Sequence, residues 1–302
     1  CTSRRYRRAG QTALLWEGDD GISRRVNYGE LHQQVNRLAA AMAQAGVQRG
    51  DIVGMCMPIT IEAVAVMFAT MKIGAVCMQI AARWAPGEVA DALARGPAKM
   101  LFVSNGYRRA GKEFSLRSIV ESAGRDVPSL EKIVVVPRLP EGPPPATRSL
   151  PQAGPRVMDY EAFLATGDAS VATLALDAEQ TALILFSSGT TGKSKAVVHT
   201  HGGALAQVAK EIGYAFDCHE PDVFYWFTNF GWMMAPWELI GGLFFGASVL
   251  LYEGTHLYPT SHRIFELIEK YGVTIFGFTP TAMRGLARTG EQFLNHNLST
   301  LR

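Results

Sequence analysis

The chain has 302 residues, of which 48% are hydrophobic and 19% are charged, and its formal net charge is +2. This composition predicts a globular protein with enough apolar material for one large domain or two. The weak positive charge gives no indication of a nucleic-acid partner, and the basic cluster within residues 4–8 is typical of a solvated terminal arm.

The first hundred residues alternate between helical and strand-like patterns. Asn27 and Glu30 have the spacing of a capping box, and they begin a predicted helix that ends at Gly46. Apolar runs and helical periodicity then predict strands at 51–57, 75–78 and 99–103 and helices at 61–73 and 86–94. Regular alternation of this kind indicates an α/β fold with a parallel sheet and crossover helices.

A strand at 132–136 leads into residues 137–155, which contain seven prolines and little that can pack. This composition is typical of a mobile surface connection. We therefore expect a first α/β lobe at 1–136, a proline-rich connection and lead-in at 137–177, and a second α/β lobe at 178–302. Each lobe is expected to hold parallel-sheet layers with crossover helices.

The second half continues the alternation. It predicts strands at 182–186, 196–199, 222–227, 247–252 and 273–278, and helices at 204–214, 237–245, 262–271 and from Pro280 onward. Residues 226–252 carry a single charge, Glu238, over a length that can cross a bilayer. Pro236, four glycines and a β-rich ending favour instead a buried helix followed by a buried parallel strand.

The four cysteines of the chain lie far apart in the sequence. Cys56 and Cys77 lie in apolar, strand-like runs, where buried and reduced thiols are the ordinary expectation. The other two are Cys1 and Cys218, and no spacing typical of a zinc site occurs. No secretory signal is visible at the start of the sequence, so we expect a cytoplasmic protein without a membrane span.

The most informative segment is Ser187-Ser-Gly-Thr-Thr-Gly-Lys-Ser-Lys195, between two predicted strands. Its glycines let the backbone approach a ligand closely, and its hydroxyls and lysines suit a polyphosphate. A Walker A loop requires a glycine where Ser187 stands and a helix after the loop, whereas Ala196-Val-Val is strand-like. The pattern predicts a phosphate-binding turn of another kind.

This segment resembles the phosphate-binding loop of the adenylate-forming superfamily, which includes acyl-CoA synthetases, luciferases and peptide-synthetase adenylation domains. The usual pattern is Tyr/Phe-Thr-Ser-Gly-Ser/Thr-Thr-Gly-x-Pro-Lys-Gly. Here Ser187 replaces the threonine, Ser194 the proline and Ala196 the last glycine. The resemblance implies that Ser187 also binds Mg²⁺. It implies the following ligands of the ATP phosphates: Ser187, Ser188, Gly189, Thr190, Thr191, Gly192, Lys193 and Lys195.

Other segments resemble the acetyl-CoA and acetoacetyl-CoA synthetases of this superfamily. Gly231-Trp-Met-Met234 is similar to the acyl-pocket segment of the acetoacetyl-CoA enzymes, which implies Trp232, Met233 and Met234 as pocket walls. Residues 255–260 and 279–284 look more like the acetyl-CoA and propionyl-CoA enzymes. By spacing alone, the aromatic and thioether cluster fits an ordinary helix core equally well.

The basic segment 105–112 resembles the turn with which these enzymes hold coenzyme A. It implies Arg108, Arg109 and Lys112 as ligands of the coenzyme A phosphates, because clustered cations at a turn bind anions. Lys112 stands where the acetyl-CoA synthetases have arginine. Without the resemblance, these charges fit a solvated loop.

The resemblance implies part of the N-terminal domain of an AMP-forming acyl-CoA synthetase. Such an enzyme uses ATP, Mg²⁺ and coenzyme A to activate a short-chain carboxylic acid as an acyl-adenylate and then as a thioester. The sequence indicates no catalytic residue, because His199 and His201 are more typical of residues that order a turn.

The chain stops before the adenine motif of these enzymes, so we expect an incomplete enzyme that is inactive alone. Two alternatives remain open at this point. One is an adenylating relative with another acyl acceptor, and the other is a non-catalytic nucleotide-binding module.

Overall fold

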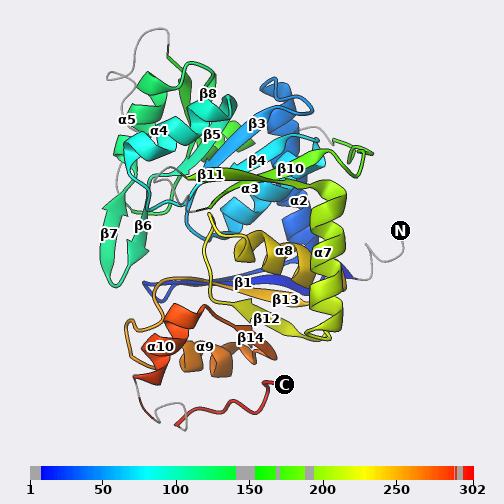
Figure 1. The fold of residues 1–302 in the computed structure, drawn as a ribbon, viewed down its shortest axis with the longest axis vertical. Coiled ribbons are helices and arrows are strands. Elements are labelled where there is room, and N and C mark those ends of the chain that lie inside the picture. Colours follow the sequence, from blue (N-terminus) through cyan, green and yellow to red (C-terminus); the bar gives the residue numbers. More distant parts are fainter. Residues whose placement is uncertain (1–7, 141–153, 168–170, 188–193, 289, 291–294) are drawn as a thin grey trace.

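The computed structural model describes residues 8–140, 154–167, 171–187, 194–288, 290 and 295–302. These residues form two large, mainly parallel sheets with helices between them and on their outer faces (Figure 1). The α/β class and the crossover helices predicted from the alternating pattern are confirmed.

The larger sheet has seven strands in the order β11-β10-β4-β3-β5-β8-β9. All neighbouring pairs are parallel except β10 and β11, which form an antiparallel pair. Its central strands are buried on both faces, which explains why they are continuously apolar. The strands are β3 (Ile52–Cys56), β4 (Val76–Gln79), β5 (Ala98–Ser104), β8 (Lys132–Val136), β9 (Arg156–Asp159), β10 (Thr181–Ser187) and β11 (Lys195–Thr200).

The smaller sheet has five strands in the order β14-β12-β13-β1-β2. Strand β1 pairs parallel with β13, with Leu14 opposite Val249, and antiparallel with β2. The sequence analysis did not predict β1 and β2. The strands are β1 (Thr12–Gly18), β2 (Ser23–Asn27), β12 (Val223–Trp226), β13 (Ser248–Glu253) and β14 (Ile275–Gly277).

Each sheet takes strands from both sides of residues 137–177. The sheets therefore do not follow the expected division into residues 1–136 and 178–302. Within the expected connection, β9 adds an edge strand to the larger sheet, and helix α6 (Tyr160–Leu164) buries Tyr160 and Phe163 in the core. This part of the segment packs because its apolar side chains meet α2 and β8. Residues 141–153 lie outside the described residues.

The helices form layers on and between the sheets (Figure 1). The middle layer is α2 (Tyr28–Gln44), α3 (Ile61–Lys72) and α8 (Met234–Phe245), with α7 (His201–Tyr214) beside α8. Helices α4 (Pro86–Arg95) and α5 (Arg117–Asp126) cover the outer face of the larger sheet. Helices α9 (Arg263–Tyr271) and α10 (Pro280–Ala287) lie beyond the smaller sheet.

Two sequence predictions about helices can be checked directly. The capping box forms at the start of α2, where Asn27 accepts from the backbone N–H of Glu30 at 2.8 Å and Glu30 accepts from that of Asn27 at 2.8 Å. Helix α8 accounts for the apolar segment 226–252, because a helix enclosed between two sheets is apolar on every face. No helix in the described part of the chain is long and apolar enough to cross a membrane.

Candidate functional site

A cavity of about 580 Å³ lies where the carboxyl ends of parallel strands from both sheets meet. Its wall comes from residues that follow β3, β4, β12 and β13, from the start of α10 after β14, and from the basic segment near residue 108. Open α/β sheets bind their ligands at this edge, because the loops there converge from several strands. The fold therefore places the candidate site here.

The first wall is the segment between β12 and α8. Trp232 and Met234 line the cavity, as do Thr228 and Asn229, whereas Met233 does not. Met233 and Met234 are both partly buried and pack against the main core. The structure thus brings two of the three predicted acyl-pocket residues to the cavity wall.

A buried hydrogen bond and an aromatic contact hold the segment between β12 and α8 in place. Glu238 of α8 is fully buried and accepts the backbone N–H of Trp226 at 2.6 Å. Burial raises the pKa of the Glu238 carboxyl well above its usual range, which favours its neutral form. Trp226 and Trp237 pack edge to face at 5.1 Å. These contacts fix where β12 ends and where the cavity-lining segment begins.

The second wall is a short hairpin made of β6 (Gly106–Arg109) and β7 (Lys112–Ser115), which we call the basic hairpin. Its turn places Ala110 and Gly111 at positive φ, 50° and 73°. Arg108 and Arg109 line the cavity, whereas Lys112, opposite Arg109 in the hairpin, is exposed and outside the cavity lining.

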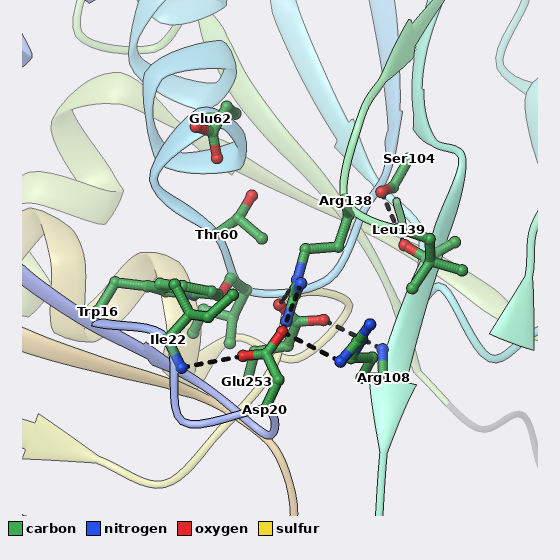
Figure 2. A network of polar contacts seen from close by, with 12 residues as sticks. Trp16, Asp20, Ile22, Thr60, Glu62, Ser104, Arg108, Arg138, Leu139 and Glu253 are labelled. Carbon is green, nitrogen blue, oxygen red and sulfur yellow. Dashed lines mark hydrogen bonds and ion pairs between the residues drawn. The ribbon is translucent and has the colours of Figure 1, made fainter. Parts of the chain in front are cut away.

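Arg108 is engaged by the protein itself, as Figure 2 shows. Its guanidinium lies 2.6 Å from Glu113 and 3.4 Å from Asp20. Its backbone N–H donates to Glu253 at 3.3 Å. These contacts fasten the basic hairpin to the β1–β2 turn and to the end of β13.

Arg138, just after β8, completes this network (Figure 2). It donates to Glu253 at 2.6 Å and to Asp20 at 3.1 Å, and its guanidinium lies 5.1 Å from the centre of the Trp16 ring. Glu253 is 3% exposed, and its burial raises the pKa of the carboxyl to about 7 although Arg138 opposes the change. These ion pairs connect the two sheets beside the cavity, and we call them the joint between the sheets.

His256 adds a neutral imidazole to the wall. It follows β13 and lines the cavity, and burial together with the charge of Arg109 lowers its pKa below the usual value. Thr255, Thr279 and Thr281 lie on the same wall. All four residues belong to the two segments, 255–260 and 279–284, that resemble acyl-CoA synthetases.

The predicted phosphate loop is described only at its flanks. Ser187 and Lys195 pair across the end of the β10–β11 hairpin, and Arg95 donates to the carbonyl of Ser194 at 3.0 Å. Neither Ser187 nor Lys195 lines the cavity. The other predicted phosphate ligands, Ser188 to Lys193, lie outside the described residues. The role of the loop stays a prediction.

The two histidines beside the loop are in different elements. His199 lies in β11 opposite Leu183, and His201 is the first residue of α7. Burial lowers the pKa of both imidazoles, so both are neutral near pH 7. Neither of them lines the cavity. Their predicted role in ordering the turn stays a prediction.

Sequence reasoning missed two charged residues of the cavity wall, Arg83 and Glu253. Both follow parallel strands, Arg83 after β4 and Glu253 at the end of β13. Their position at the carboxyl end of a predicted strand is the signal that could have identified them.

Known proteins that are similar to this chain agree with the resemblance seen in its sequence. The profile of the family described as "AMP-binding enzyme" matches residues 2–302. The chain is 35% identical to acetyl-coenzyme A synthetase of Gemmatimonas aurantiaca, over 98% of this chain and 45% of that protein. It is also 35% identical to acetyl-coenzyme A synthetase 2 of Pseudomonas aeruginosa, over 96% of this chain and 44% of that protein.

A solved structure is also similar to this chain. The acetoacetyl-CoA synthetase from Streptomyces lividans superimposes with a TM-score of 0.87 at 28% identity. The match covers 98% of this chain and 44% of that one. The chain therefore spans a little under half the length of the relatives that it matches.

Proposed function

The chain belongs to the AMP-binding enzyme family, and on this premise we propose that it is part of an AMP-forming ligase that joins a short-chain carboxylic acid to coenzyme A. One observation carries the proposal. A single cavity combines an arginine-bearing hairpin with a wall made of Trp232 and Met234. Such a cavity suits a ligand with phosphate groups at one end and a small apolar acyl group at the other.

The proposed reaction has two steps. A carboxylate oxygen of the acid attacks the α-phosphorus of ATP, and pyrophosphate leaves with the electrons of the broken phosphoanhydride bond. The thiolate of coenzyme A then attacks the acyl carbon, and AMP leaves. The relatives named acetyl-coenzyme A synthetase support a two-carbon or similarly short acid as the substrate.

In this proposal, the phosphate end of ATP is bound at the β10–β11 hairpin. Ser187 and Lys195 pair across its end, so a hydroxyl and an ammonium group flank the loop on both strands. Mg²⁺ keeps several waters and binds substrate phosphates, so it needs few protein ligands. The Ser187 hydroxyl is a hard oxygen donor that fits this requirement. When bound, the ion neutralises charge on the phosphates.

The acyl end would be bound beside Trp232 and Met234, with Thr228 and Asn229 as polar neighbours in the same wall. Methionine is flexible, and one methylene in such a pocket changes affinity by only about 1–3 kcal/mol. We therefore propose a short acyl group as the substrate class, without selecting acetate over acids that are slightly longer.

Calorimetric titration of the purified chain tests this function. We expect coenzyme A and MgATP each to bind with a dissociation constant of roughly 1 µM to 1 mM. Arg109→Gln should weaken the binding of coenzyme A and leave the binding of MgATP unchanged. Lys195→Gln should weaken the binding of MgATP and leave the binding of coenzyme A unchanged. Arg25→Gln is the matched control, because Arg25 is exposed on β2 and does not line the cavity.

The outcomes separate the possible functions. Binding of MgATP without coenzyme A would contradict ligation to coenzyme A and would favour another acyl acceptor. Binding of neither ligand would contradict the proposal as a whole.

A further inference from the structure

Arg95, the last residue of α4, contacts both strands of the β10–β11 hairpin at its loop end. On the β11 side, its guanidinium donates to the carbonyl oxygen of Ser194 at 3.0 Å and to the hydroxyl of Ser194 at 3.3 Å. On the β10 side, its guanidinium carbon lies 5.7 Å from the centre of the Phe186 ring. One side chain from another part of the fold therefore connects the two sides of the predicted phosphate loop.

Arg95 is itself oriented for these contacts. Its Nε atom lies 3.0 Å from the carboxylate of Asp91, one turn earlier in α4, so each nitrogen of the guanidinium has a partner. Hydrogen bonds in the plane of a guanidinium leave its face free for an aromatic ring. Phe186 also packs on Trp84, with ring centres 5.3 Å apart, and both rings pack against the apolar cluster between α4 and the larger sheet.

The contact with the Ser194 hydroxyl depends on a departure of this chain from the usual loop pattern. Ser194 stands where that pattern has proline. A proline ring would fix φ at this position and would carry no hydroxyl, whereas serine leaves φ free and offers an acceptor. Arg95 therefore supplies, from outside the loop, a restraint that the loop sequence itself lacks.

This restraint acts next to the groups that are proposed to bind phosphate. Phe186 directly precedes Ser187, Ser194 directly precedes Lys195, and Ser187 lies opposite Lys195 in the hairpin. Because Arg95 holds one residue on each strand, it limits how far the two strands can separate at this point. A binding segment that is restrained in advance loses less conformational entropy when its ligand binds.

We propose that Arg95 is a positioning residue for nucleotide binding, which holds the two sides of the hairpin in the arrangement that the phosphate end of ATP requires. Arg95 acts through Ser194 and Phe186, and its guanidinium is directed at the protein and not at the phosphates. The inference rests on the function proposed above, in which the hairpin binds MgATP.

Calorimetric titrations with MgATP and with coenzyme A test this role. Arg95→Gln should raise the dissociation constant of MgATP about fivefold to tenfold, because hydrogen bonds from a charged group are lost. The dissociation constant of coenzyme A should not change, because neither Arg95 nor Ser194 lines the cavity. Arg117→Gln is the matched control. Arg117 is also an exposed helix residue paired with a carboxylate one turn away, Glu121 at 2.9 Å, and its variant should bind MgATP like the wild type.

Two further variants distinguish positioning from an effect of charge. Arg95→Lys keeps the charge, but a single ammonium group does not reproduce the planar fork, so its affinity for MgATP should stay close to that of Arg95→Gln. Ser194→Ala keeps the carbonyl acceptor and removes the hydroxyl, so its loss of affinity should be smaller. The double variant, Arg95→Gln with Ser194→Ala, should bind MgATP like Arg95→Gln alone, because both changes act through one contact.

Urea unfolding separates this role from a general effect on stability. Arg95 is exposed at the end of α4, so its variants should keep the wild-type unfolding midpoint. A lower midpoint together with an equal loss of affinity for coenzyme A would overturn the positioning role.

The remaining outcomes bear on separate claims. If the wild type binds MgATP and Arg95→Gln binds it equally well, the positioning role is overturned while the proposed function stands. Wild-type affinity in Arg95→Lys, or losses that multiply in the double variant, would also overturn it. A wild-type chain that binds no MgATP overturns both the positioning role and the proposed function.

Discussion

Glu253 shows how one buried carboxyl connects the joint between the sheets to the cavity. Its two oxygens accept from the Arg138 side chain and from the Arg108 backbone, and the same side chain lines the cavity. Asp20, which contacts both arginines, brings a second carboxylate close to it. Burial dominates, and the pKa of Glu253 is raised from 4.5 to about 7.

This raised pKa predicts a pH-dependent contribution to stability. Because the folded pKa lies above the unfolded value, the contribution is fully present below about pH 4.5 and is lost as the pH rises through 7. Glu253→Gln removes the titration. Between pH 5 and pH 8, the free energy of unfolding of the variant should therefore rise relative to the wild type, by up to about 3 kcal/mol.

Urea unfolding at pH 5 and pH 8 measures this difference. Glu179→Gln is the control, because Glu179 is an exposed carboxylate away from the cavity. The difference in the free energy of unfolding between this variant and the wild type should be the same at both pH values. If the difference for Glu253→Gln is also the same at both pH values, the Glu253 carboxyl has the same pKa in the folded and the unfolded chain.

At the scale of elements, the β12–α8 segment depends on Gly231. Its φ is +94°, and a Cβ there would lie 2.7 Å from the Cβ of Ala81 and 2.9 Å from two Ala81 backbone atoms. Ala81 lines the cavity in the segment between β4 and α4, which we call the β4 loop, two residues before Arg83. The close approach of these two segments therefore sets the distance between Trp232 and Arg83.

Gly231→Ala should destabilise the chain through two effects, the left-handed backbone and the clash with Ala81. Gly46→Ala isolates the first effect, because Gly46 has φ +90° and open space around its Cα. We expect a loss of about 1–2 kcal/mol for Gly46→Ala and a clearly larger loss for Gly231→Ala, measured by urea unfolding. Equal losses of free energy for the two variants would mean that the β4 loop shifts away from the added Cβ at no cost.

The sequence predicts individual elements well where the signal is local. The capping box at Asn27 and the periodicity of α2 are examples, because neither depends on distant residues. Strands β1 and β2 were missed. The first holds a short apolar run, Ala13 to Trp16, that is followed by the buried charge of Glu17, and the second reads Ser-Arg-Arg-Val-Asn and is mostly exposed, so neither shows the alternation that is typical of a half-buried strand. Strand β1 pairs with β13, which lies more than 200 residues away in the chain, and β2 pairs with β1.

The site could be predicted only in part for the same reason. The segment 231–234 indicated an acyl-pocket wall, but Met233 and Met234 are both partly buried and both pack against the main core, so the sequence does not show that only Met234 of the two lines the cavity. Arg83 has no local motif. Its place in the wall arises only when the ends of β4 and β12 meet across the two sheets.

At the scale of the whole molecule, a buried ionic cluster joins the first strand to the last part of the chain. Glu17 of β1 is 3% exposed on its side chain and pairs with Arg263 and Lys270 of α9, the latter at 2.7 Å. The hydroxyl of Tyr271 also donates to it. Helix α9 covers the outer face of the smaller sheet, so this cluster fixes the helix to the strand beside β13.

Glu17→Ala should therefore lower the free energy of unfolding by about 3–5 kcal/mol, because removing one partner leaves the buried Arg263 with Glu266 as its remaining carboxylate partner. Glu121→Ala is the control. It removes the exposed pair with Arg117, 2.9 Å apart on α5, and should cost about 0–1 kcal/mol. Urea unfolding of both variants at pH 7 gives the comparison. Similar small losses would show that water replaces Glu17 around Arg263, and that apolar packing alone holds α9 on the sheet.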